Sequence, residues 1–134
     1  VKYCGAVSYK EVMRVMHDSD IVVIAEGFEK KNIIITKYSL STKAADAMAT
    51  GSQILVYGDS DCGVVGYMES TGCSVVCTEK NTEALKQKIC ELLNNPKLQN
   101  ELYQMSGKMS AEHHSKRRNL ELCEKMFNDL IEKG

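Results

Sequence analysis

Residues 21–25, Ile-Val-Val-Ile-Ala, constrain the possible folds of this chain more than any other segment. The run is apolar throughout and rich in β-branched side chains, which favour extended backbone. It lacks the polar alternation of a half-exposed strand, so the pattern is typical of a strand buried on both faces, as in a parallel sheet covered by helices. The segment therefore predicts an α/β fold.

Helical and strand-like patterns alternate along the chain, as an α/β fold requires. Lys2–Cys4 is a short strand candidate, and Ser8 with Glu11 forms a capping box for a helix that ends near His17. The later expectations are strands at 54–57 and 74–77, a helix at about 63–70, and helices that begin near residues 41, 81, 95 and 115. We expect a single domain over residues 1–134, with a Rossmann-like parallel sheet flanked by helices and a helical C-terminal tail.

Two segments leave alternatives open. Residues 26–40 are expected to form a long loop, in which Ile33–Ile35 is either a short strand or an apolar plug. The last helix carries an apolar seam that we expect to pack either on this sheet or on a partner domain. The seam consists of Leu120, Cys123, Phe127, Leu130 and Ile131.

Composition excludes several classes of protein. A formal net charge of -1 gives no electrostatic reason to expect a nucleic-acid partner, and no apolar run approaches the length of a membrane span. The six cysteines contain no Cys-x-x-Cys pair and lie mostly in apolar segments, which favours free thiols in a reducing, cytoplasmic compartment. His113 and His114 point in different directions on a helix, so we interpret them as a helix end and expect no metal.

The helix expected after residue 41 begins with groups suited to an anion. The first-turn amides of a helix lack intrahelical partners and carry the positive end of its dipole. Ser41 and Thr42 supply hydroxyls there, Lys43 adds a positive charge, and Asp46 suits a pair of sugar hydroxyls. The pattern indicates a nucleoside diphosphate site. The alternative is an ordinary capped helix, ended by Gly51, whose Lys and Asp form a solvated surface pair.

Four blocks, in order, resemble the C-terminal, donor-binding half of GT-B glycosyltransferases of the retaining family 4, or group 1, type. Residues 3–12 resemble the family's aromatic, glycine, valine and capped-helix segment, and residues 19–24 its Asp-led apolar strand. Residues 39–51 resemble its Glu-Ala-Met-Ala-x-Gly helix, and residues 81–131 its closing helices. The similarity covers essentially the whole chain.

The resemblance implies roles for individual residues. The carboxylate that binds the donor ribose falls on Asp46, a shorter side chain than the family's glutamate, and the amides that bind the distal phosphate fall on Ser41 and Thr42. Lys43 stands where a proline is common. The segment from Gly5 to Val7 would lie against the nucleobase. The family's sugar-binding glutamate falls on Tyr38 and is therefore absent.

The resemblance also implies an activity for the full-length enzyme. A hexose would pass from a nucleoside diphosphate sugar, with retention and without a metal ion, to a glycan or lipid-linked acceptor in cell-surface polysaccharide synthesis. We expect a cytoplasmic enzyme, with peripheral attachment to the inner face of the membrane as an alternative.

The family has further parts that these 134 residues do not contain. They are an N-terminal acceptor domain and two early strands with a basic residue pair, and those strands would lie between the Lys2–Cys4 and Ile21–Ala25 strands. The chain alone is therefore expected to be inactive.

Other classes of protein fit less well. Glu26-Gly27-Phe28 imitates the start of the family motif, but Ile34 stands where its second carboxylate would be. Asp59 and Asp61 follow a strand as in a response-regulator receiver, although the rest of that pattern does not align. A nucleotide-sugar epimerase of the same architecture and a non-catalytic α/β binding domain remain as alternatives.

Overall fold

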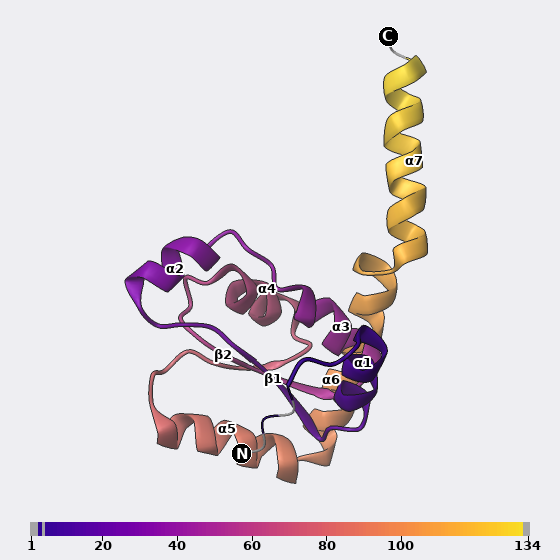
Figure 1. Ribbon diagram of the computed structural model, residues 1–134. Helices are drawn as coiled ribbons and strands as arrows, with labels where there is room; N and C mark the ends of the chain where they lie inside the picture. Colours follow the sequence, from indigo (N-terminus) through magenta and orange to yellow (C-terminus); the bar gives the residue numbers. More distant parts are fainter. Residues whose placement is uncertain (1–2, 4, 133–134) are drawn as a thin grey trace.

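Three parallel strands form the centre of the fold, in the order β1-β2-β3 (Figure 1). The structure is a computed structural model that describes residue 3 and residues 5–132. The strands are β1 (Ile21–Ala25), β2 (Gln53–Tyr57) and β3 (Val75–Cys77). The helices are α1 (Tyr9–His17), α2 (Lys30–Thr36), α3 (Thr42–Thr50), α4 (Gly63–Thr71), α5 (Thr82–Asn94), α6 (Pro96–His113) and α7 (Lys116–Glu132). The parallel α/β prediction is confirmed.

Several helix ends follow from local side-chain chemistry. The hydroxyl of Ser8 accepts a hydrogen bond of 3.3 Å from the amide of Glu11, as expected for the N-cap of α1. The side-chain carbonyl oxygens of Asn81 and Asn95 accept hydrogen bonds from backbone amides in the first turns of α5 and α6. Gly51 ends α3 with φ 76°, a left-handed backbone that glycine adopts without steric cost.

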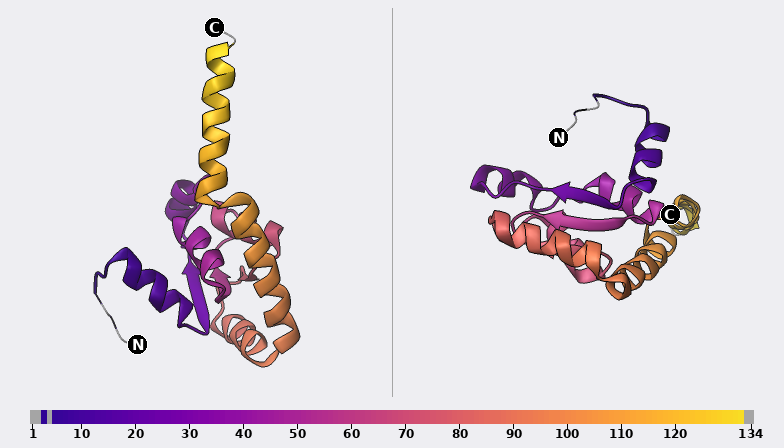
Figure 2. Two further views of the ribbon diagram at one scale, coloured as in Figure 1. Left: turned by 90° about the vertical axis from the view of Figure 1, so that its right-hand side faces the viewer. Right: turned by 90° about the horizontal axis from the view of Figure 1, so that it is seen from below.

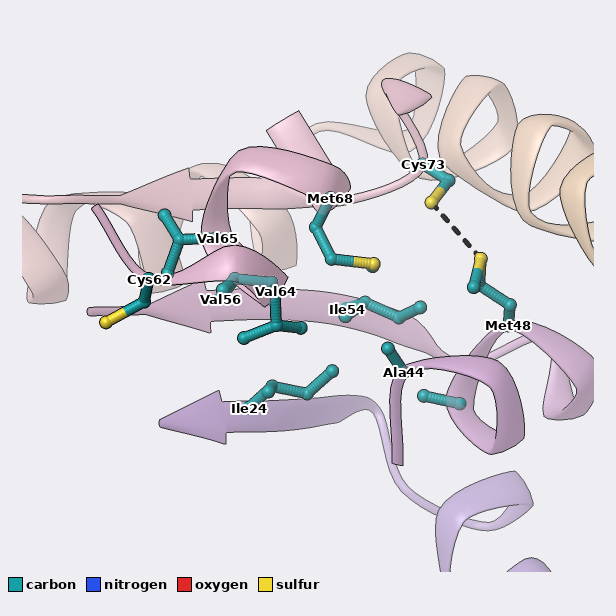
Figure 3. Close-up of a cluster of buried hydrophobic side chains, with 11 residues drawn as sticks. Ile24, Ala44, Met48, Ile54, Val56, Cys62, Val64, Val65, Met68 and Cys73 are labelled. Atoms are coloured by element: carbon teal, nitrogen blue, oxygen red, sulfur yellow. Dashed lines mark hydrogen bonds between the residues drawn. The ribbon is translucent and has the colours of Figure 1, made fainter. Parts of the chain in front are cut away.

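The first core cluster lies between one face of the sheet and the helices α3 and α4 (Figure 3). The small side chains Ala44 and Ala47 let α3 approach the strands closely. Cys73 and Met48 place their sulfur atoms 3.5 Å apart within the cluster. The remaining buried members are Ile24, Ile54, Val56, Cys62, Val64, Val65 and Met68.

The second core cluster covers the opposite face, where α5 and α6 lie in the right-hand view of Figure 2. Leu55 and Val75 from the strands contact Leu92 of α5 and Leu102 of α6. The buried hydroxyl of Ser106 also donates a hydrogen bond of 3.1 Å to a backbone carbonyl beside β3, so α6 is joined to the sheet by polar as well as apolar contacts.

Strand β1 is less buried than its sequence predicts. Val23 is 53% exposed, because α5 and α6 cover β2 and β3 and leave the middle of β1 open. Within the described part of the chain, β1 pairs with β2 alone, so its other edge has no strand beside it. The prediction of a strand over Ile21–Ala25 is confirmed, and the prediction that both its faces are buried is wrong.

The expected loop over residues 26–40 contains the helix α2. Ile33 packs against the first core cluster, whereas Ile34 and Ile35 face solvent. The Thr36 hydroxyl donates to the carbonyl of Asn32 within the helix. Neither a strand nor an apolar plug forms there, since the segment is helical and two of its three isoleucines are exposed.

The two last helices differ in their relation to the core. Helix α6 packs on the sheet, while α7 projects away from it (Figures 1 and 2). No side chain of α7 is buried, and the apolar side chains of its expected seam are exposed. The alternative in which this seam packs on the chain's own sheet is therefore wrong.

Some expectations concern only part of the described chain. The strand candidate Lys2–Cys4 falls mainly on residues outside it, and Tyr3 has no regular secondary structure. Cys62, Cys73 and Cys77 are free and buried, and Cys90 and Cys123 are free and exposed. None of the helices described here is long and apolar enough to cross a membrane.

Candidate functional site

The start of α3 presents one outward side to solvent. Ala44, Ala47 and Met48 are buried against the sheet. Thr42 and Lys43 are exposed and Asp46 is partly buried, since these positions turn away from the core along the helix. The structure thus brings the predicted hydroxyl, ammonium and carboxylate groups to one side of α3, within a single turn.

The N-terminus of α3, like those of α2 and α4, has no hydrogen bond to the side chain of its N-cap residue. Ser41 occupies the N-cap position with extended backbone, but its hydroxyl accepts no hydrogen bond from the first turn, unlike the caps of α1, α5 and α6. The first-turn amides therefore have no side-chain acceptor among the described residues. Lys43 forms no ion pair with any of them either, so its ammonium adds a positive charge to that of the helix N-terminus.

Asp46 has a partner that the sequence did not reveal. The phenol of Tyr9, at the start of α1, donates a hydrogen bond of 2.9 Å to Oδ1 of Asp46. The acceptor carboxylate raises the pKa of Tyr9, through this hydrogen bond first and through its charge second. Helix α1 packs beside α3 and so carries Tyr9 into the candidate site. A contact across 37 positions of sequence has no signal in local patterns.

Gly5 and Val7 lie on the segment that enters α1, and both are exposed. Gly5 has φ 73°, and a side chain there would meet nothing within 4 Å. Among the described residues, Tyr9 and not Gly5 or Val7 reaches hydrogen-bond distance of Asp46. The predicted base-binding segment therefore leads into α1, whose Tyr9 makes the contact with Asp46.

A small cavity lies just before the start of α3. It has a volume of about 210 Å³ and is lined by residues 37–40, Gly63 and Tyr67. A Cβ atom on Gly63 would lie 2.7 Å from the carbonyl oxygen of Lys37, so this close approach of two backbones requires glycine. Tyr38, which occupies the position of the family's sugar-binding glutamate, lines the cavity and is 92% exposed.

Residues 26–28 and the Asp59–Asp61 turn have structural roles. Glu26 donates its amide to the carbonyl of Tyr57 at 2.8 Å, and Phe28 packs on the Tyr57 ring with centroids 5.0 Å apart. Asp59 accepts from the Asp61 amide at 3.0 Å, as in a turn. These contacts lie at the C-terminal ends of β1 and β2.

Acidic and basic groups elsewhere do not form a metal centre. Lys80, after β3, lies 2.8 Å from the carboxylate of Glu29, which lowers the pKa of that carboxyl. Among residue 3 and residues 5–132, no three His, Cys, Asp or Glu side chains gather closely enough to hold a metal ion.

Comparison with protein-family models, with curated proteins and with solved structures found no match to this chain.

Proposed function

We propose that the chain binds the diphosphate and ribose of a nucleoside diphosphate sugar at the start of α3, as the donor-binding half of a GT-B glycosyltransferase. One observation carries the proposal: among the described residues, no side chain accepts a hydrogen bond from the amides of the N-cap Ser41 and of Thr42, and Lys43, which forms no ion pair with those residues, lies beside them, one turn from Asp46. Anions bind at such helix starts because both the N–H groups and the helix dipole favour negative charge.

The same groups would assist transfer in the full-length enzyme. When the bond between the hexose and the donor phosphate breaks, negative charge grows on the departing diphosphate. Fixed amides at Thr42 and the ammonium of Lys43 would stabilise that charge without having to reorganise. Asp46 would hold the ribose. The resemblance supplies the identity of the donor, and the helix geometry supports the phosphate position.

Two surfaces of the chain support the proposal that it is part of a larger protein. Among the described residues no strand pairs with the outer edge of β1, and this is the side on which the resemblance implies further strands. The exposed apolar face of α7 offers Leu120, Phe127, Leu130 and Ile131 to a partner. We propose that the N-terminal acceptor domain of the same enzyme covers α7, and that the glycan or lipid-linked acceptor is bound by that domain.

Sugar recognition by this half differs from the family pattern. Tyr38 stands where the family has the glutamate that contacts the transferred sugar. Its side chain lines the cavity formed by residues 37–40, Gly63 and Tyr67, so we propose that the Tyr38 phenol contacts the hexose.

Calorimetric titration with UDP, GDP and ADP at low ionic strength tests the proposal. We expect one of these to bind, and Lys43→Ala to weaken its affinity about 2- to 5-fold through loss of one exposed charge near the phosphates. Lys86→Ala, which removes an exposed lysine from α5, is the matched control and should change nothing. Absence of binding by all three nucleotides, or equal effects of both substitutions, would contradict the proposal.

A further inference from the structure

We propose that Tyr9 is a ribose-binding residue that works jointly with Asp46, an inference that rests on the proposed donor site. A carboxylate that binds a ribose diol uses its two oxygen atoms as acceptors for the two hydroxyl groups. In this chain, Oδ1 of Asp46 already accepts the hydrogen bond from the Tyr9 phenol. Oδ2 has no hydrogen-bond partner among the described residues. Oδ2 and a second lone pair of Oδ1 remain for the ribose diol, and the Tyr9 phenol oxygen beside them offers one further acceptor.

The phenol oxygen of Tyr9 is suited to that role. Its proton is directed to Asp46, which leaves the oxygen lone pairs free to accept a hydrogen bond. A hydroxyl that donates to an anion also becomes a better acceptor, because hydrogen bonds in a chain polarise one another. The ribose diol would then donate one hydrogen bond to Oδ2 of Asp46 and one to Oη of Tyr9.

The position of Tyr9 is fixed by the fold. Tyr9 is the first residue of α1, and Ser8 caps that helix through the Glu11 amide. At the other end of α1, the Ser52 hydroxyl donates a hydrogen bond to the carbonyl of Met16. The C-terminal end of α1 is thus tied to the residue before β2, and α1 packs on α3. The phenol nevertheless remains 67% exposed, so a ligand can reach it.

The pair also accounts for the shortened carboxylate. Asp46 is one methylene shorter than glutamate and reaches less far from α3. Tyr9 approaches from a second helix and places a further acceptor 2.9 Å beyond Oδ1. The side chains of Asp46 and Tyr9, from two neighbouring helices, would thereby take the place of the single longer glutamate side chain.

Substitution of Tyr9 by phenylalanine, with ribonucleotides and deoxyribonucleotides as probes, tests the inference. The wild-type chain is titrated with UDP, GDP and ADP and with their 2′-deoxy forms. We expect it to prefer the ribonucleotide, and Tyr9→Phe to lower that preference about 2- to 10-fold, the range for one lost hydrogen bond. Tyr103→Phe, on α6, is the control and should retain the full preference.

A second variant separates a binding role from a structural one. In an Asp46→Asn background, Tyr9→Phe should change the preference for the ribonucleotide less than it does in the wild-type chain, because the two side chains contact each other. Amide spectra of each variant establish that the fold is kept. If wild-type chain binds a nucleotide but Tyr9→Phe leaves the preference unchanged, or strengthens binding, the inference is overturned while the donor site stands. If wild-type chain binds no nucleotide, both fail.

Discussion

The phenol oxygen of Tyr9 lies 2.9 Å from Oδ1 of Asp46 and joins the start of α1 to the outward side of α3. This hydrogen bond links the segment that begins at Gly5 with the helix whose N-terminus is open to an anion. The candidate site is therefore formed by two helices that are far apart in sequence and packed together in the fold.

The Tyr9–Asp46 contact predicts an unusual tyrosine titration. The pKa of Tyr9 is raised above its ordinary value of 10.0 because the carboxylate of Asp46 accepts its proton in a hydrogen bond. Since the folded state favours the protonated phenol, this contribution to stability is present below pH 10.0 and is lost as the pH rises through the higher, folded pKa. Ultraviolet absorbance should show two late-titrating tyrosines, Tyr9 and Tyr67, and Asp46→Asn should shift only one of them to lower pH. An unchanged curve in Asp46→Asn would argue against the contact.

The partial burial of His114 predicts loss of stability in mild acid. Burial first, and the neighbouring His113 second, lower the pKa of His114 below 6.5, and its Nε2 lies 2.6 Å from the Tyr67 hydroxyl. The fold favours neutral His114, so stability is full above pH 6.5 and falls as the pH drops through the lower, folded pKa. Urea midpoints measured across this interval should decline in the wild-type chain and decline less in His114→Asn. A parallel decline in both would assign the effect to other groups.

Two neighbouring leucines on α5 predict contrasting effects. Leu92 is fully buried in the second core cluster, whereas Leu93 is 51% exposed. Leu92→Ala should destabilise the fold by about 2–5 kcal/mol through lost burial and a cavity, and Leu93→Ala by less than about 1 kcal/mol. Urea denaturation measures both. Similar losses in the two variants would mean that α5 is rotated relative to the sheet.

Glycine substitutions test the end of α3. Gly51 has φ 76°, and a Cβ atom there would lie 2.8 Å from the ring of Tyr103. Gly51→Ala should therefore cost about 1–2 kcal/mol from backbone strain alone. Gly66→Ala lies inside α4 with nothing near the new methyl group, and should stabilise by up to about 1 kcal/mol. Thermal denaturation of both variants checks the difference in sign.

Deletion of α7 tests its independence from the core. Residues 116–132 bury no side chain, so a chain that stops at residue 115 should keep its sheet and its thermal midpoint almost unchanged. The same deletion should reduce binding of a hydrophobic dye, because it removes exposed apolar side chains. Circular dichroism and dye fluorescence provide the measurements. Unfolding of the shortened chain would show that α7 packs on the sheet.

The sequence predicted those elements whose patterns are local. The continuous apolar run at 21–25 and the caps at Ser8, Asn81 and Asn95 depend on neighbouring residues, and the structure confirms the elements they mark. The three consecutive isoleucines at 33–35 were uninformative, because their β-branched character suggests a strand while the fold uses only Ile33.

Local sequence patterns could not predict the contacts between segments that are distant in the sequence. The exposure of Val23 depends on which strands α5 and α6 cover. The direction of α7 depends on the fact that none of its side chains is buried against the core. The pairing of Tyr9 with Asp46 depends on how α1 packs against α3. The positions of Ser41, Thr42, Lys43 and Asp46 on one helix could be predicted, since helical periodicity alone places them.

The most direct test of the donor site is an amide chemical-shift titration of the wild-type chain with UDP, GDP and ADP. We predict that one nucleotide shifts the amide signals of Ser41 to Ala45 first, together with those of Tyr9 and Asp46, and leaves α5 unaffected. Inorganic phosphate should shift the amides of Ser41 to Ala45 only weakly. No shift with any nucleotide, or shifts confined to residues away from α1 and the start of α3, would contradict the account.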